Sequence, residues 1–482
     1  MFAWLTVSHL LTLLIISFAW RADSHRKLVL TPFVTYVFLD LVFSWNYWLL
    51  FSEFDFIITP SIVLISLLAT LCFTAGSLIS CGGGLRSERA DNARALSNFL
   101  IKPVVLSAPK WKYKRAAMVL LVGGVALSSF YYRGEPPSFK AAVRFAVGGD
   151  LSEAHSILSS GRRELTKAHV FEGEYRGQGF VKRLMRAVWT YGLTMSVLIG
   201  MAQRSTFWLI SVGFFFCGVC YYVGGTGERA PLLFSFLAVL ISISYVRKLK
   251  YRHILGWGLA LLLLLISVSL LMPRFKAVSR TRTEVASSLV TSVARRIMAG
   301  NKINNVLIMK YVEEGSLGYT YGREHLNFLI NAIPGIHKAP LANELASMEK
   351  GMTTTYFSGT YLGKVYLDFG VIGVLSIYSA LGFVLQETHR RFLKCRKTVE
   401  NVAFLGLLNL GLGMMSFSAG LIGLLTGMVP VLVVHYITTL CLGKRAGLRS
   451  GGRIVGTRAG RGYGRWRLHE RAVDYGANGK VV

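Results

Sequence analysis

Arginine and acidic side chains gather around closely spaced glycines in the first of two long polar segments of the chain. Arg176 follows Glu172 and Glu174 and precedes Gly177 and Gly179, a pattern that predicts an irregular turn. An arginine guanidinium can hold two phosphate oxygens at once, which makes Arg176 a candidate phosphate ligand. It could equally pair with Glu172 or Glu174, and the sequence leaves both interpretations open. Glu174 is also a candidate general base.

The second polar segment combines cationic, acidic and imidazole side chains between glycines and prolines. Arg323, Glu324 and His325 are consecutive, and His337 and Lys338 follow a Pro-Gly pair. The glycines and prolines predict an irregular path along which these side chains can converge. The cluster of Arg323, Glu324 and His325 is therefore a candidate catalytic group.

Lys364 and Asp368 stand four residues apart at the start of an apolar run, so a helix places both on one face. Two interpretations remain open. The charges can neutralise each other where isolated charges would be costly, or they can form the floor of a polar cavity below the second polar segment. On the second interpretation Asp368 is a further candidate base and Lys364 a further phosphate ligand.

Three more arginines are candidate ligands for an anion. Arg229 lies in a short glycine-rich turn that ends at Pro231, a residue able to open the next helix. Arg280 and Arg282 precede a predicted amphipathic helix in which Val285, Leu289, Val293 and Ile297 recur every four residues. Such a helix typically lies on a membrane surface with its arginines among lipid phosphates.

The composition indicates what kind of fold must position these residues. The chain has 482 residues, of which 53% are hydrophobic and 16% charged, and this exceeds the apolar content of a soluble domain. Because a membrane-crossing helix needs roughly 20 mainly apolar residues, we predict an all-α polytopic integral membrane protein with about eleven transmembrane helices. The predicted spans are 2–20, 28–51, 57–80, 116–132, 187–202, 205–223, 231–246, 254–272, 362–385, 399–418 and 421–442.

Charge in the short connections predicts the orientation. Lys and Arg crowd 21–27, 82–115, 247–253 and 386–398, whereas the connections of opposite parity hold only Arg229. By the positive-inside rule the amino terminus is periplasmic and the carboxyl terminus cytoplasmic. We therefore predict a single transmembrane domain over 1–442 with two long helical extracytoplasmic loops, 133–186 and 273–361.

The net charge is distributed over both predicted sides of the membrane. The formal charge is +30, and much of it belongs to cytoplasmic segments, including the Gly/Arg-rich tail 443–482. That tail is similar to nucleic-acid-binding segments, but we interpret it as a disordered tail that contacts anionic membrane lipids and predict no nucleic-acid partner. The outer loops are also net basic, which suggests an anionic ligand.

Short motifs in these places resemble the Wzy-type O-antigen and oligosaccharide repeat-unit polymerases of bacterial envelopes, over about 116–442. They are Arg-Gly-x-Gly at 176–179, Thr-Gly-x-Arg-x-Pro at 226–231, Tyr-Gly…Ile-Pro…Lys-x-Pro at 321–340 and Gly-x-x-Tyr-x-Asp-Phe-Gly-x-x-Gly at 363–373. The family's R-x10-G pattern fits once, at Arg162 and Gly173, and has no convincing copy in the second loop.

The resemblance implies a glycosyltransferase-C-like membrane enzyme of the bacterial inner membrane. Its substrates would be polyprenyl-diphosphate-linked oligosaccharides, and a chain-length regulator protein would be a further partner. The growing glycan would leave its lipid diphosphate and join the non-reducing end of a new repeat unit. Preset arginines suit a departing diphosphate, and the candidates are Arg176, Arg229, Arg280 and Arg323, with Arg282 and Lys364 behind them. The acceptor hydroxyl needs a base, worth about 10²–10⁴ in rate when well placed. We rank His325 first as that base, then Glu324, Glu174 and Asp368. The sequence has no D-x-D pair, so we predict no metal site and no cofactor.

Other functions compatible with the sequence are an O-antigen ligase, which passes the finished glycan to another acceptor, and a membrane transporter or flippase. Transporters usually show internal repeats and a polar site at mid-span. This chain shows no repeat, and its polar residues concentrate in the outer loops. The sequence favours a polymerase but does not separate it from a ligase, and it does not disclose the sugar, the linkage or the oligomeric state.

Overall fold

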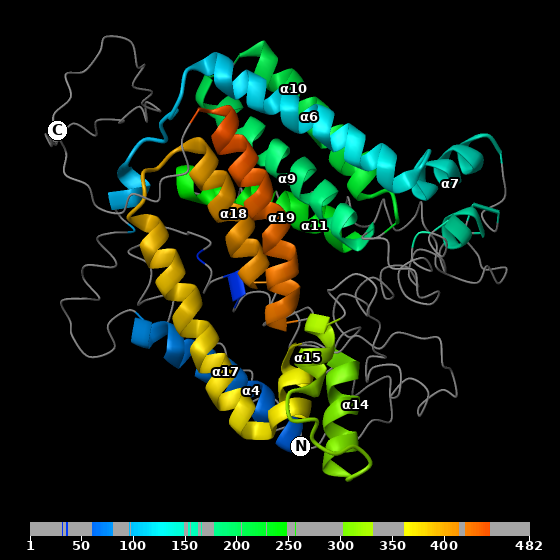
Figure 1. Cartoon of the computed structure of the whole chain (residues 1–482), viewed down its shortest axis with the longest axis vertical. Helices are drawn as coiled ribbons and strands as arrows, with labels where there is room; N and C mark the ends of the chain where they lie inside the picture. Colours follow the sequence, from blue (N-terminus) through cyan, green and yellow to red (C-terminus); the bar gives the residue numbers. More distant parts are fainter. Residues whose placement is uncertain are drawn as a thin grey trace, which may run out of the picture.

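The chain folds into α-helices (Figure 1). A computed structural model describes residues 31, 35–36, 60–80, 96, 98–148, 153–154, 156–161, 165, 178–203, 205–227, 229–247, 256, 302–330, 361–413 and 420–443. Within these residues there is no β-strand, and Val105 and Thr398 form an isolated bridge. The all-α class is therefore confirmed for the described part of the chain.

Most of the predicted spans coincide with helices. Within the described residues, five helices are long and apolar enough to cross a membrane: α4 (Pro60–Ser80), α6 (Lys110–Tyr132), α9 (Gln178–Gln203), α10 (Thr206–Gly218) with its π-helical continuation η1 (Val219–Val223), and α17 (Tyr361–Leu393). Shorter apolar stretches at 231–246, 399–411 and 427–441 fall in three further predicted spans. They belong to α11 (Arg229–Val246), α18 (Val399–Gly413) and α19 (Gly420–Cys441). The predicted spans 2–20, 28–51 and 254–272, apart from isolated positions, lie outside the described residues, as does the tail from 444.

Several helices extend beyond their apolar runs. The span predicted at 187–202 is the inner part of α9, which begins at Gln178, and α17 continues past residue 385 to Leu393. An apolar run marks only the part of a helix that hydrocarbon would surround, whereas backbone hydrogen bonding continues into the polar region. Arg186 therefore belongs to the same helix as the span that follows it.

Short helices occur in the two predicted outer loops. α7 (Pro137–Ala146) begins with a proline at its first turn, where the missing N–H costs nothing. In the first loop, residues 153–154 and 156–161 are also helical, and the second loop contains α14 (Lys302–Glu313). The irregular path predicted from residue 319 was wrong for Arg323–Ile330, which form α15. The amphipathic helix predicted at 285–297 lies outside the described residues.

α4 and α17 lie side by side along most of their length (Figure 1). Glycine at two facing positions allows the backbones to approach closely. A Cβ atom at Gly382 would lie 2.0 Å from the Phe73 carbonyl oxygen, and one at Gly76 would lie 1.9 Å from the Ser379 carbonyl oxygen. The Ser77 hydroxyl donates to the Gly382 carbonyl across the same contact at 3.2 Å. This is how helices associate in lipid, where small residues and interhelical hydrogen bonds replace the hydrophobic drive.

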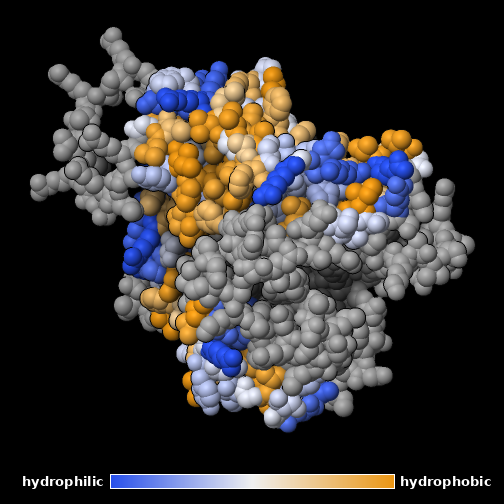
Figure 2. Space-filling view, turned by 45° about the vertical axis from the view of Figure 1, so that its right-hand side comes forward, coloured by the Kyte–Doolittle hydropathy of each residue, from blue (hydrophilic) through white to orange (hydrophobic). Residues whose placement is uncertain are grey.

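α9 forms the centre of the remaining helices and contacts α6, α10, α11, α18 and α19. Its Trp189 is buried, and the indole N–H donates to the Ser128 hydroxyl of α6 at 3.0 Å. The outer faces of α6 and α10 are apolar, and Figure 2 shows hydrophobic residues gathered in a broad patch over the upper part of the visible face. These faces suit contact with lipid. Their large exposed side chains are Met118, Val119, Val122, Val125 and Phe130 on α6 and Leu209, Ile210, Phe214 and Phe216 on α10.

A buried polar network fixes the start of α18. The Glu400 carboxylate accepts hydrogen bonds from the hydroxyls of Ser107 and Tyr113, both at 2.7 Å. Nearby, the Lys397 ammonium donates to the carbonyls of Leu100 and Lys102 at 3.2 and 2.8 Å. Burial lowers the pKa of Lys397 to about 8. The connection between α17 and α18 is therefore anchored on residues 98–113.

Candidate active site

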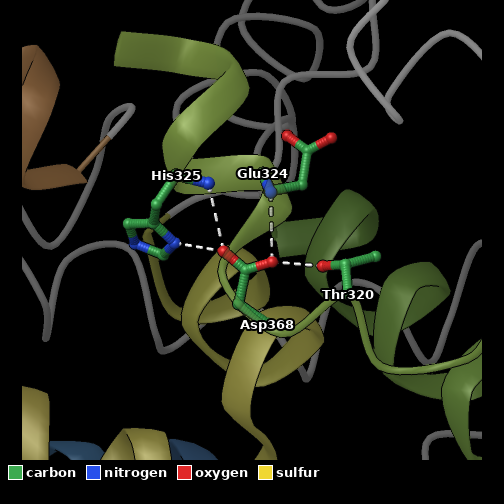
Figure 3. Close-up of polar contacts among 4 residues, drawn as sticks. All are labelled: Thr320, Glu324, His325 and Asp368. Atoms are coloured by element: carbon green, nitrogen blue, oxygen red, sulfur yellow. Dashed lines mark hydrogen bonds and ion pairs between the residues drawn. The ribbon is translucent and has the colours of Figure 1, made fainter.

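A buried carboxylate joins α15 to α17. Asp368 lies in the first part of α17 and is fully buried. Its carboxylate accepts hydrogen bonds from the Thr320 hydroxyl, from the backbone N–H of Glu324 at 3.2 Å, and from the backbone N–H of His325 at 3.1 Å. A fourth hydrogen bond joins it to Nδ1 of His325 (Figure 3). An acceptor that satisfies four donors is an ionised carboxylate.

The same carboxylate explains why a helix starts at Arg323. The first N–H groups of a helix have no partner within the helix and need an acceptor from elsewhere. Asp368 supplies it to α15, and its negative charge also lies at the positive end of the helix dipole. Sequence patterns for helix starts look for a capping residue just before the helix, whereas here the cap comes from another helix. For this reason the local sequence did not predict α15.

A tight turn connects Thr320 to α15. The N–H of Arg323 donates to the Thr320 carbonyl at 2.9 Å, and the two central residues, Tyr321 and Gly322, have φ of 48° and 89°. Positive φ at both central positions defines a type I′ turn, which favours Asn or Gly at the first of them. A tyrosine there costs about 1–2 kcal/mol. The N–H of Thr320 also donates to the Leu367 carbonyl at 3.0 Å, which fixes the turn on α17.

α17 is interrupted directly after Asp368. Gly370 has φ 60° and ψ −150°, a conformation that other residues adopt only with strain. The ring of Tyr319 lies against this glycine, and a Cβ atom there would lie 3.2 Å from it. The break separates the segment that carries Asp368 from the longer apolar part of α17.

His325 is held in one orientation, and its second ring nitrogen is buried. Because Nδ1–H donates to Asp368, Nε2 of the neutral ring carries the lone pair. Nε2 has no hydrogen-bond partner among the described residues. The rings of Tyr361 and Phe369 lie 5.6 and 5.9 Å from the imidazole ring, measured between ring centres. A carboxylate that orients an imidazole, whose second nitrogen is unpartnered, has the geometry of a general base.

The structure brings together half of the predicted site residues. Arg323 is exposed at the start of α15, and Lys364 lies one turn before Asp368, close enough to Asp368 and Glu324 for electrostatic interaction with both. Glu324 is buried, and Figure 3 shows its carboxylate pointing away from Asp368. The predicted one-faced arrangement of Lys364 and Asp368 is present, but the hydrogen bonds that Asp368 accepts come from residues 320–325.

The structure describes one more predicted site residue, Arg229, and it lies apart from this group. Arg229 begins α11, after a turn that packs on the start of α7 through a 3.0 Å hydrogen bond from the Ser138 N–H to the Gly225 carbonyl. In Figure 1, α7 and α15 are well separated. The remaining candidates lie outside the described residues: Glu174, Arg176, Arg280, Arg282, His337 and Lys338. Within the described part, His, Cys, Asp and Glu form no group of three able to hold a metal ion.

Sequence reasoning missed Thr320 and Tyr321. Thr320 donates to a carboxylate 48 residues away, and nothing in its local sequence signals that contact. The Tyr-Gly pair at 321–322 does predict a turn, but the unusual conformation of Tyr321 appears only in the backbone. The role of Asp368 was also underestimated, because its fourfold hydrogen bonding makes it a positioning residue for His325 and α15.

Comparison with known proteins gives the chain a family. No curated protein and no solved structure matches it. A family model for O-antigen polymerases matches residues 24–437, which is most of the chain. This match agrees with the apolar helices and with the resemblance seen in the short motifs, and it includes both α15 and the Asp368 segment of α17. The chain belongs to the O-antigen polymerase family, whose members are glycosyltransferase-like membrane enzymes of polysaccharide biosynthesis.

Proposed function

We propose that this protein polymerises polyprenyl-diphosphate-linked oligosaccharide repeat units at the periplasmic face of the inner membrane. In the reaction, an acceptor hydroxyl oxygen attacks the anomeric carbon of the donor glycan. The bond from that carbon to the diphosphate oxygen breaks, and the diphosphate leaves with the bonding electrons. The acceptor proton passes to a base on the enzyme.

The observation that carries this proposal is the pairing of His325 with buried Asp368. Nε2 of His325 is the atom that would take the acceptor proton. The Asp368 carboxylate holds the ring and stabilises the imidazolium that forms. Thr320 and the N–H groups of α15 in turn hold the carboxylate. A base fixed in this way needs little reorganisation when the proton moves.

Cationic residues near the dyad suit the departing diphosphate. Arg323 is exposed two residues before His325, and Lys364 lies on the Asp368 helix. In our proposal both bind the diphosphate as its charge develops, together with Arg176, Arg229, Arg280 and Arg282. These cationic side chains would neutralise the diphosphate, so the proposed reaction needs no metal ion.

The proposed topology follows the distribution of basic residues. The amino terminus and both long loops face the periplasm, and the carboxyl terminus faces the cytoplasm. The dyad, at the amino-terminal end of α17, is then within reach of a lipid-linked substrate in the outer leaflet. A chain-length regulator protein is a further proposed partner.

The decisive experiment supplies the purified protein with polyprenyl-diphosphate repeat units alone. We expect a ladder of glycan lengths, and a His325→Gln protein should give none above background. A single product formed only after addition of a core acceptor would identify a ligase instead. No product with either acceptor, together with substrate movement across a vesicle membrane, would identify a transporter.

A further inference from the structure

An aromatic side chain projects into solvent beside the His325–Asp368 pair. Tyr321 is 84% exposed, more than the other large hydrophobic and aromatic side chains in the described part of the chain. It lies in the turn whose neighbouring residue, Thr320, donates to Asp368. The turn is therefore tied to the proposed base through the same carboxylate, and the Phe369 ring lies against its Gly322.

Neither packing nor turn chemistry explains a tyrosine at this position. The ring is too exposed to contribute to a core, and the left-handed backbone of Tyr321 favours Asn, Asp or Gly. Residues held in such sparsely populated conformations concentrate at functional sites, where the surrounding structure maintains them. The ring itself is then the feature that needs an explanation.

Two further exposed rings flank the same place. Tyr319 is 43% exposed and packs on Gly370, and Phe369 is 42% exposed with its ring centre 5.9 Å from that of His325. A surface of aromatic rings with a few polar groups is what binds a sugar. The C–H face of a pyranose stacks on the ring, while its hydroxyls form hydrogen bonds at the ring's edge and with nearby polar side chains.

We propose that Tyr321, together with Tyr319 and Phe369, forms an aromatic subsite that binds a pyranose ring of the acceptor glycan next to His325. This inference rests on the proposed function, because it takes His325 as the base for the acceptor hydroxyl. Stacking orients the acceptor so that its hydroxyl faces the His325 ring. Tyr321 thus contributes to acceptor affinity and not to proton transfer.

The test uses an acceptor that cannot act as a donor. The probe is the O-antigen repeat oligosaccharide of the source bacterium, carried as an octyl glycoside, which has no diphosphate to lose. Tyr321→Asn removes the ring and keeps a residue that tolerates positive φ, whereas Tyr321→Phe keeps the ring. Binding of the probe to the full-length protein in lipid nanodiscs is measured by calorimetry, and transfer to it by product analysis with a saturating lipid-linked donor.

We expect Tyr321→Asn to weaken probe binding and to raise the KM for the probe about tenfold, a factor equivalent to ~1.4 kcal/mol. Tyr321→Phe should stay within about twofold of the wild type, and the KM for the lipid-linked donor should not change in either variant. Phe130→Asn, at an exposed aromatic residue of α6, should leave all these values unchanged.

Two results would overturn the subsite. One is equal binding of the probe to the wild type and to Tyr321→Asn. The other is a loss of activity that affects donor and acceptor alike in Tyr321→Asn and Phe130→Asn, as expected if exposed aromatic residues only anchor the protein at the membrane surface. Failure of the proposed function would look different, because the wild type would then bind the probe without transferring glycan to it.

Discussion

Asp368 performs two tasks that are usually separate. Its carboxylate accepts hydrogen bonds from N–H groups in the first turn of α15 and also orients the His325 ring, so the residue that starts the helix also positions the proposed base. A carboxylate buried among apolar side chains is stable only because its donors compensate for lost hydration. Any change at Asp368 should therefore affect both local structure and chemistry, and the two effects can be separated by choosing the substitution.

Substitution of His325 by Gln should lower the rate of glycan transfer by about 10²–10⁴, because the base is lost while the protein stays folded. Asp368→Asn keeps an acceptor for the N–H groups of α15 but loses the charge that stabilises the imidazolium, so a reduction of about 10² or more is expected. Initial rates of ladder formation measure both effects.

Glu324→Gln is the matched control for these variants. Glu324 is the neighbour of His325, but its carboxylate points away from Asp368, so its substitution should change the rate much less (Figure 3). Near-normal transfer by His325→Gln, with a large loss in Glu324→Gln, would show that Glu324 is the base. Thermal unfolding of each variant reveals whether a lost rate reflects lost folding.

Helix pairs in this protein depend on how closely their backbones approach. α4 and α17 meet at Gly76 and Gly382, where no side chain fits, and a serine hydroxyl bridges the same contact. α17 also carries the Asp368 segment, so the α4 contact supports the helix on which the proposed site is built. At its other end, α17 is followed by the connection that Lys397 anchors to residues 98–102.

Replacement of Gly382 by Leu should separate α4 from α17 and lower the thermal unfolding midpoint, with a destabilisation of about 3 kcal/mol or more, since backbone atoms cannot yield as flexible side chains do. Gly213→Leu on α10 is the control, because a Cβ atom there meets no other atom within 4 Å. Midpoints in detergent for the two variants should differ clearly. Equal midpoints would contradict the close α4–α17 packing.

The burial of Lys397 predicts that the free energy of unfolding rises with pH. Its folded pKa of about 8 is below the ordinary 10.5 because burial disfavours the charged form. Between these values the unfolded chain binds a proton that the folded chain does not, so the free energy of unfolding rises with pH across the window from about 8 to 10.5. Below pH 8 Lys397 is protonated in both the folded and the unfolded state, so its contribution to the free energy of unfolding stays at its least favourable value. The total change is at most ~3 kcal/mol.

Thermal unfolding at pH 7.5 and 9.5 measures this contribution. Between these pH values the wild-type midpoint should rise relative to that of Lys397→Met, which has no titrating group at position 397. If both midpoints fall, that of the wild type should fall less. Lys394→Met removes an exposed lysine from the same connection and should behave like the wild type. If all three proteins show the same pH dependence, Lys397 does not titrate in this window.

The proposed orientation of the chain in the membrane rests on what lies at the two ends of α17. After the break at Gly370, the helical residues 371–393 span about 35 Å, more than the roughly 30 Å of the hydrocarbon core. The His325–Asp368 pair lies towards one end, and Arg390 and Arg391 lie in the last turn at the other. Positive charge at that end predicts a cytoplasmic location, which leaves the dyad on the periplasmic side.

Single-cysteine proteins test this orientation in intact cells. With all other cysteines replaced by serine, the exposed Cys395 should react with a membrane-impermeant maleimide only after the cells are opened. A cysteine introduced by Tyr321→Cys should react from outside once the outer membrane is made permeable. Cys72, which is buried, should react in neither case. The reverse labelling pattern for positions 321 and 395 would invert the proposed topology.

Local sequence determined where this protein forms its apolar helices, because a bilayer imposes the same requirement for length and polarity on every span. It also placed Lys364 and Asp368 on one helical face, and it identified Arg323, Glu324 and His325 as reactive side chains. It could not identify the partner of Asp368, since His325 lies 43 residues away and contacts of that kind depend on how the chain folds back. For the same reason α15, whose cap comes from another helix, and the strained turn at Tyr321 became visible only once α17 and residues 319–330 were packed together.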